Sequence, residues 1–199
     1  NVSTFNNVTF SKNTAGTHGG AVYSTGFGQF KNCTFTENSG TYGGAAYSRD
    51  RWITFDGSTF NSNYATSGGG GAIAFQSGNN TQGVKNSVFS GNTASGGGAI
   101  MLYTAAAPIE NCLFINNYAQ STGGAIQAGA DNSISGSTFT DNVWTALNLE
   151  CGYTFVVGSI FKGNNVVCNN ICCNIFCMQI YYYRINCNVW FHGANNHDR

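Results

Sequence analysis

A repeated pair of short motifs constrains the fold of this chain more than any other feature. The first motif is Phe-x-x-Asn, and the second is Gly-Gly-Ala followed by an aliphatic residue or Ala. The first motif begins at Phe10, Phe35, Phe60, Phe89, Phe114, Phe139 and Phe161, in steps of 25, 25, 29, 25, 25 and 22 residues. The second begins at Gly19, Gly43, Gly70, Gly97 and Gly123. A period in the twenties indicates stacked repeats, each too small to bury its own apolar face.

The composition of the repeats favours strands over helices. Gly, Asn, Ser and Thr dominate every copy, and these residues are poor in helix interiors. Leucine-rich repeats share the period but need a lattice of Leu residues that is missing here. Small or apolar residues instead alternate with polar ones, which is typical of strands. An apolar column precedes the Phe column by five residues: Phe5, Phe30, Phe55, Val84, Ile109, Ile134 and Val156.

Each copy predicts two strands joined by a tight corner. Only Asn and Gly stand three residues before each Phe, which is what a backbone position with positive φ selects. These corner residues are Asn7, Asn32, Gly57, Asn86, Asn111, Gly136 and Gly158. The Gly-Gly-Ala segment supplies a third strand, and its expected inward column is Val22, Ala46, Ile73, Ile100, Ile126 and Leu147.

Three strands per coil, repeated in register, predict an all-β fold. We expect a single right-handed parallel β-helix of about seven rungs, one for each Phe-x-x-Asn copy. The Phe rings of successive rungs are expected to stack on one another. The Asn side chains of the same motif are expected to form an amide ladder inside a turn.

The paired motifs resemble the repeats of chlamydial polymorphic outer membrane proteins and of related right-handed β-helix repeat proteins. The resemblance rests on Phe-x-x-Asn and Gly-Gly-Ala-[Ile/Leu/Val] recurring in a fixed order, and it covers residues 1–164. Such repeats occur in adhesins, passenger domains and surface scaffolds. The resemblance therefore implies the fold and a surface role, without implying a particular activity.

The sequence changes character after Asn164. We expect two parts: a parallel β-helix over residues 1–164 and a Cys-rich C-terminal cap over residues 165–199, because the open end of a solenoid needs a cover. Six cysteines in or near this tail are disulfide candidates, with free thiols as the alternative: Cys151, Cys168, Cys172, Cys173, Cys177 and Cys187. Their spacing lacks the paired Cys-x2-Cys of a zinc site, so we expect no metal. Cys33 and Cys112 fall in a small inward column and are predicted to be buried free thiols.

Composition excludes several classes of function. Charged residues make up 8% of the chain and the net charge is zero, so no basic patch predicts nucleic-acid binding. No apolar run approaches the roughly 20 residues of a membrane span.

The chain opens within a strand, so we expect a fragment or mature piece whose start is missing. Low charge with abundant Ser, Thr, Asn and Gly predicts an extracellular or cell-surface location, where sequons permit N-glycosylation at Asn1, Asn7, Asn32 and Asn79.

Catalysis by this chain is not predicted. Many right-handed β-helices are polysaccharide lyases, epimerases or glycosidases, and these need carboxylates that converge in space. Glu37 and Asp141 share a column but lie four coils apart, about 19 Å. The compact group from Arg49 to Asp56 is interpreted as a solvated loop. We therefore expect no cofactor, and we keep a lyase- or epimerase-like enzyme as an alternative.

The outward residues beside the Phe column predict a flat binding face. Its polar members are Thr9, Ser11, Thr34, Thr36, Thr59, Asn61, Ser90, Thr138 and Thr140. Regular Thr ranks resemble the ice-binding surface of hyperactive antifreeze proteins, although Leu113, Ile115 and Lys162 interrupt them. The Ala column of the second motif is a further flat face if it points outward.

The leading prediction is a non-catalytic extracellular or cell-surface scaffold that is adhesive or assembly-forming. Its expected partners are other protein chains, either copies of itself or matrix proteins, or surface glycans. Ice is the partner in the antifreeze alternative.

Overall fold

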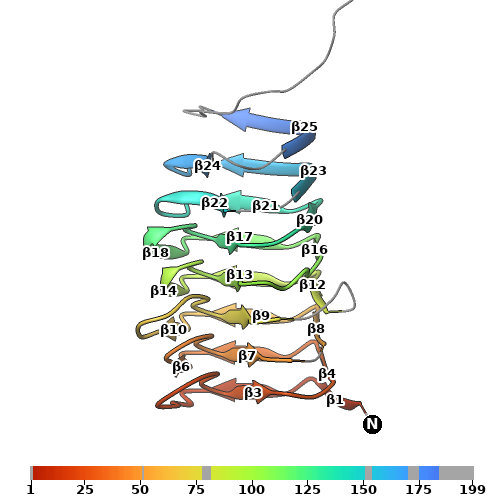
Figure 1. Cartoon of the computed structure of the whole chain (residues 1–199), viewed down its shortest axis with the longest axis vertical. Coiled ribbons are helices and arrows are strands. Elements are labelled where there is room, and N and C mark those ends of the chain that lie inside the picture. Colours follow the sequence, from red (N-terminus) through yellow and green to blue (C-terminus); the bar gives the residue numbers. More distant parts are fainter. Residues whose placement is uncertain (1, 51, 78–81, 151–153, 170–174, 184–199) are drawn as a thin grey trace, which may run out of the picture.

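Short strands and tight corners wind into a parallel β-helix in the computed structural model (Figure 1). The structure describes residues 2–50, 52–77, 82–150, 154–169 and 175–183, and it describes side chains as far as residue 165. Equivalent strands of successive coils pair in parallel, and the coils form the rungs of a rod. The described residues contain no helix, and therefore none long and apolar enough to cross a membrane. The predicted all-β solenoid is confirmed.

Two strands of each rung, on either side of the predicted corner, form the largest sheet. The strands before the corner are β1 (Ser3–Asn6), β4 (Gly28–Lys31), β8 (Ile53–Asp56), β12 (Gly83–Lys85), β16 (Ile109–Glu110) and β20 (Asn132–Ser135). The strands after it are β2 (Thr9–Ser11), β5 (Thr34–Thr36), β9 (Thr59–Asn61), β13 (Val88–Ser90), β17 (Leu113–Ile115) and β21 (Thr138–Thr140). The long strand β23 (Thr154–Lys162) pairs with both β20 and β21, so it joins the two series into one sheet.

The Gly-Gly-Ala segments lead into the predicted third strand. These strands are β3 (Val22–Ser24), β7 (Ala46–Ser48), β11 (Ile73–Phe75), β15 (Ile100–Leu102), β19 (Ile126–Ala128), β22 (Thr145–Leu149) and β24 (Val166–Asn169). A short third sheet, which the sequence did not predict, lies between the second and third strands of each rung. It contains β6 (Ser39–Gly40), β10 (Tyr64–Ala65), β14 (Thr93–Gly96) and β18 (Tyr118–Thr122).

The Phe column forms the spine of the core, as predicted. Each ring stacks on the next with centroids 4.7–4.9 Å apart and planes within 8° of parallel, from Phe10 to Phe161. The rings from Phe35 to Phe139 are fully buried. A second stack of Phe5, Phe30 and Phe55 meets the first edge-on. Offset stacking and edge contacts each add roughly 0.5–1.5 kcal/mol beyond burial.

The Asn residues of the first motif form the predicted amide ladder. The Asn92 side chain shows the pattern, because its Oδ1 accepts hydrogen bonds from the backbone N–H and the Nδ2 of Asn63, both at 3.0 Å. Its own Nδ2 donates to Oδ1 of Asn117 and to the carbonyl oxygen of Phe60, also at 3.0 Å. The same set recurs from Asn38 to Asn142, so these buried amides leave no polar atom unpaired.

Positive φ occurs at every predicted first corner, with values of 51–61°. A second corner, one residue before each ladder Asn, also has positive φ, and the sequence did not predict it. Its members are Lys12, Glu37, Ser62, Gly91, Asn116, Asp141 and Gly163. Each rung therefore turns tightly on both sides of the second strand.

The sheets continue beyond Asn164. Strand β24 pairs with β22, and β25 (Ile175–Tyr183) pairs with β23 along its whole length. The predicted cap over residues 165–199 therefore includes strands that extend the solenoid, and residues 184–199 lie outside the described residues. The extra length of the 29-residue step is divided between the connection from β10 to β11 and the connection from β11 to β12, where residues 78–81 are also outside the described residues.

Candidate functional site

A column of alternating charges runs along the rod on the face formed by β4, β8, β12 and β16. Lys31, Asp56, Lys85 and Glu110 each end one of these strands, and the strand register places each directly beside the next. We call these four residues the charged strip. The side chains point outward because the residues before them, such as Phe55 and Val84, point into the core. This strip was not predicted from the sequence.

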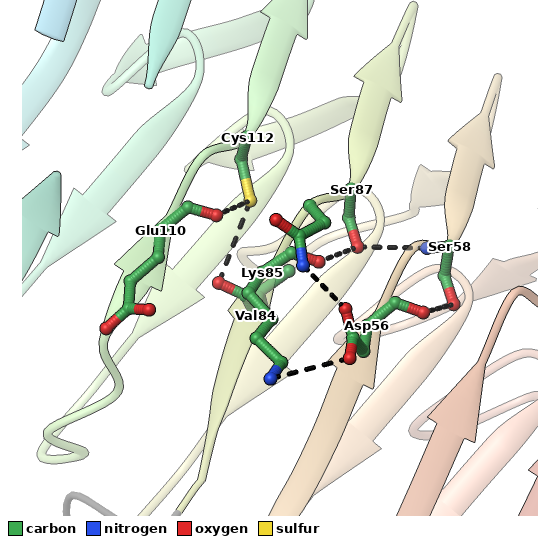
Figure 2. A network of polar contacts seen from close by, with 8 residues as sticks. Asp56, Ser58, Val84, Lys85, Ser87, Glu110 and Cys112 are labelled. Atoms are coloured by element: carbon green, nitrogen blue, oxygen red, sulfur yellow. Dashed lines mark hydrogen bonds and ion pairs between the residues drawn. The ribbon is translucent and has the colours of Figure 1, made fainter. Parts of the chain in front are cut away.

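The centre of the charged strip is tied together by polar contacts (Figure 2). Nζ of Lys85 lies 3.5 Å from Oδ2 of Asp56, and Nδ2 of the corner residue Asn86 donates to Oδ1 of Asp56 at 2.8 Å. Lys31 and Glu110, at the two ends, have no ion-pair partner among the described residues. Their charges are exposed and available to an outside group.

A hollow of about 400 Å³ lies beside the charged strip. The outward column next to the strip runs Gln29, Thr54, Gly83 and Pro108, and all four residues line the hollow. A Cβ at Gly83 would lie 2.7 Å from the Pro108 carbonyl oxygen. Pro108 stands just before β16, where its missing N–H costs no hydrogen bond of the strand, and its carbonyl oxygen accepts a hydrogen bond from the Val84 N–H at 3.0 Å. The hollow falls within the usual size range of ligand sites, about 300–1,000 Å³.

Small polar side chains beneath the strip lock its backbone in place. Ser87 Oγ donates to the Lys85 carbonyl at 2.7 Å and accepts from the Ser58 N–H at 3.1 Å (Figure 2). Cys112 occupies the same column, and its Sγ lies 3.2 Å from the Glu110 carbonyl oxygen. Burial raises the pKa of the Cys112 thiol to about 12. Cys33 and Cys112 are buried free thiols, as predicted, and Cys112 is protonated at neutral pH.

The predicted flat face is built on the strands after the first corner. All nine of its polar residues lie on β2, β5, β9, β13 or β21, beside the buried Phe column and in register from rung to rung. We call these nine residues the threonine face. They are exposed or half-buried, so they are accessible from outside the rod. Leu113 and Ile115 on β17 interrupt the polar ranks between Ser90 and Thr138.

A second hollow, of about 410 Å³, lies among aromatic side chains near the third strands. Tyr23 and Tyr47 stack with centroids 5.7 Å apart, and His18 lies 4.4 Å from the Tyr47 ring. Nη1 of Arg49 lies 3.4 Å from the Tyr23 hydroxyl, and this hydrogen bond raises the pKa of Arg49. Desolvation raises the pKa of Tyr47, whose hydroxyl lies 3.0 Å from Oε1 of Gln76. Aromatic faces beside polar tips suit a sugar or peptide ligand.

The carboxylates considered for catalysis are dispersed. Glu37 pairs with Lys12 at 3.8 Å, and Arg49 pairs with Asp50 at 3.7 Å, both at exposed positions where such pairs contribute little. Asp56 belongs to the charged strip rather than to the group that includes Arg49. The charged strip offers ion pairing and hydrogen bonding, which are means of binding.

The remaining predicted positions divide between described and undescribed residues. Asn7 and Asn32 are exposed at first corners, whereas Asn1 and Asn79 lie outside the described residues. Among the disulfide candidates, Cys151, Cys172, Cys173 and Cys187 lie outside them, and the structure describes only the backbone of Cys168 and Cys177. Glycosylation and disulfide formation stay predictions. The Ala column of the second motif is buried, so it forms no outer face.

Comparison with known proteins finds one family. Three segments, residues 7–25, 86–102 and 111–129, match the family model of the Chlamydia polymorphic membrane protein repeat. Each segment contains a Phe-x-x-Asn copy and the whole of the following third strand, and the resemblance of the motifs to this repeat is confirmed. No curated protein and no solved structure matches the chain.

Proposed function

We propose that this chain is a non-catalytic extracellular or cell-surface β-solenoid scaffold that is adhesive or assembly-forming. The observation that carries the proposal is the repeat itself. Three segments match a repeat of surface proteins, and that repeat builds a rod with regular outer faces. The partners we propose are other protein chains, copies of this chain included, or surface glycans.

The distribution of polar groups supports a scaffold. Inside the rod, the Asn ladder and the Ser column use their polar atoms to join one rung to the next. The outer threonine face and the charged strip are the polar surfaces that recur over several rungs. A repeated surface favours many weak contacts, which add up when several are made together.

Adhesion can be tested with beads that carry the purified chain. We expect coated beads to bind animal or plant cell surfaces, or extracellular matrix, more than beads coated with albumin. A variant with Thr34→Arg and Thr59→Arg should lose binding if the threonine face is the adhesive surface. Ser133→Arg, at an exposed position on β20, is the matched control. A chain that binds no surface and stays monomeric at every concentration would contradict the proposal.

Ice binding is the second candidate, and the register of the threonine face favours it. The outward residues of neighbouring rungs lie directly side by side, at a strand spacing of about 4.8 Å. The apolar pair Leu113 and Ile115 breaks the array, so we expect no thermal hysteresis from the scaffold. Hysteresis that disappears in Thr34→Arg and persists in Ser133→Arg would favour the antifreeze function instead.

A further inference from the structure

We propose that the charged strip docks onto the charged strip of a second copy of this chain, with the two rods side by side and antiparallel. The proposal rests on the assembly-forming role given above, and it adds the surface, the partner and the orientation. The order of the charges, their exposure and the shape of the neighbouring column carry it.

The order of charges makes the strip self-complementary in one orientation. From β4 to β16 the charges run positive, negative, positive, negative, one to a rung. A two-fold axis along the strand direction, passing between β8 and β12, reverses this order in the second copy. Lys31 then faces Glu110 of the second copy, and Asp56 faces its Lys85. Such a contact is isologous, so each pair is made twice.

Parallel rods facing each other at equal height are disfavoured by the same charges. In that arrangement every residue of the strip faces its own counterpart, so Asp56 meets Asp56 and Lys85 meets Lys85. Like charges brought together at an interface cost several kcal/mol. The strip therefore selects the antiparallel orientation over the parallel one.

The column beside the strip fits the same orientation. The two-fold axis that pairs Asp56 with Lys85 also places Thr54 of one rod opposite Gly83 of the other. Gly83 has no side chain, and the half-buried Thr54 carries its side chain outward from β8. An outward side chain thus stands opposite a residue without one twice in the pair.

The two ends of the strip lack an ion-pair partner in the part of the chain that the structure describes. Lys31 and Glu110 are exposed and form no ion pair among the described residues. They are separated by three rungs, about 14 Å, which is too far for a direct contact. Docking places an opposite charge of the second copy beside Lys31 and beside Glu110. The central pair of Asp56 and Lys85 then has opposite charges as neighbours both within its own chain and across the interface.

The proposed contact buries a small area, and this area limits how strongly two chains associate. Four rungs at about 4.8 Å and four residues at about 3.3 Å give an area on the order of 250 Å² per rod. Stable interfaces bury about 800 Å² per partner. Association is therefore weak and sensitive to salt, and it becomes effective where many copies are held close together.

Carbodiimide cross-linking tests the orientation, because it joins a Lys amine directly to a carboxylate. We expect a cross-link between Lys31 and Glu110 in concentrated protein at low salt. An equal mixture of ¹⁴N- and ¹⁵N-labelled chains should give mixed-isotope peptides for this cross-link, which proves that it joins two chains. Cross-links confined to Lys85 and Asp56 of one chain would overturn the proposal.

Charge reversal tests the same contact in solution by sedimentation velocity. We expect Glu110→Lys to remove the association, since it sets two positive charges face to face at both ends of the strip. Lys31→Glu combined with Glu110→Lys restores opposite charges and should restore association. Glu37→Lys lies off the strip and should leave association unchanged. Circular dichroism and thermal midpoints confirm that each variant folds.

The outcomes separate this inference from the proposed function. If Glu110→Lys associates as strongly as the parent chain, the strip contact is overturned, and the chain is an assembly-forming scaffold that uses another face. A monomeric chain that still binds cells would overturn the strip contact and leave the adhesive role. Loss of association in Glu110→Lys, together with its recovery in the double variant, supports the contact as described.

Discussion

Single side chains hold this rod together by making the same contact on every rung. Each buried ladder Asn accepts two hydrogen bonds at Oδ1 and donates two from Nδ2. A buried polar group that loses its partner costs about 1–3 kcal/mol, so the ladder is stabilising only while it is complete. The ladder therefore both supports the fold and makes it sensitive to single substitutions.

Replacing Asn92 with Ala should lower the free energy of unfolding by about 3–5 kcal/mol, because two donors of Asn63 and the Phe60 carbonyl lose their partner together. Urea unfolding followed by circular dichroism measures this change. Asn13→Ala is the matched control, since Asn13 is exposed and its side chain makes one ladder bond, to Asn38. Equal losses in the two variants would show that the buried ladder does not provide the stability.

The thiol of Cys112 predicts a loss of stability at high pH. Its pKa rises from 9.0 to about 12 on folding, so between those values the unfolded chain binds fewer protons than the native one. Stability should therefore fall as the pH rises from about 9 to about 12. Ser occupies the same column at Ser58 and Ser87, so Cys112→Ser should fold normally.

Urea midpoints of the parent chain and Cys112→Ser, measured at pH 8 and pH 10.5, test this prediction. Tyrosines such as Tyr103, whose pKa burial raises to about 12, titrate equally in both chains and cancel in the comparison. The parent chain should lose more stability between the two pH values. Identical losses would mean that the thiol is not the titrating group.

At the scale of elements, each rung depends on the corner that leads into its third strand. In this corner, Gly70 has φ of 74°. A Cβ at the next residue, Gly71, would collide with the carbonyl oxygen of Gly98 on the neighbouring rung. Two glycines are therefore needed for different reasons, the first for its dihedral angle and the second for the close approach of two rungs.

Gly71→Ala should destabilise the chain by more than about 3 kcal/mol, since backbone on both sides must move to admit a methyl group. Gly26→Ala is the control, because a Cβ there meets nothing within 4 Å and should change stability by less than about 1 kcal/mol. Thermal unfolding of the two variants gives the comparison. A folded, equally stable Gly71→Ala chain would contradict the close approach of the rungs.

Elements that repeat one residue type were predictable from the sequence, and those that mix types were not. The first corner admits only Asn and Gly, so its positive φ could be foreseen. The second corner has the same φ at Lys12, Glu37 and Ser62, whose side chains give no such signal. The strands of the short third sheet each follow a ladder Asn and have Ala or Gly at their second position, but their other residues and their lengths vary, so no strand pattern stands out.

The charged strip escaped prediction for a related reason. Its members differ in sign, and the 29-residue step separates Asp56 from Lys85 in the sequence. Only the strand register shows that they are neighbours. The strip becomes visible in the sequence when the residues four positions before each motif Phe are aligned. Charges of alternating sign then fall in one column, at Lys31, Asp56, Lys85 and Glu110.

At the scale of the whole molecule, each rung contacts only its neighbours (Figure 1). Stability in such a solenoid is approximately a sum of rung and interface contributions, so it varies along the rod. Phe10 is only half-buried, whereas Phe89 is fully buried between two rings. In the described structure the rung of Phe89 is therefore better shielded from solvent than the rung of Phe10.

Hydrogen exchange should reveal this gradient. We expect the backbone amides of β2 to exchange faster than those of β13, since among the described strands β2 pairs with β5 alone, whereas β13 pairs with both β9 and β17. Mass spectrometry of peptides from the two strands measures the rates. Equal protection would indicate that the rod opens only as one unit.

The parallel pairing of the strands also sets the mechanical response of the rod. Hydrogen bonds between rungs lie along the rod axis, so tension applied at its two ends pulls on them one layer at a time. Each rung that unfolds shortens the folded part of the rod by about 4.8 Å and releases a segment of about 25 residues, which extends to about 85 Å. The molecule as a whole therefore becomes longer. A tether built this way lengthens in steps under load and dissipates energy at each one.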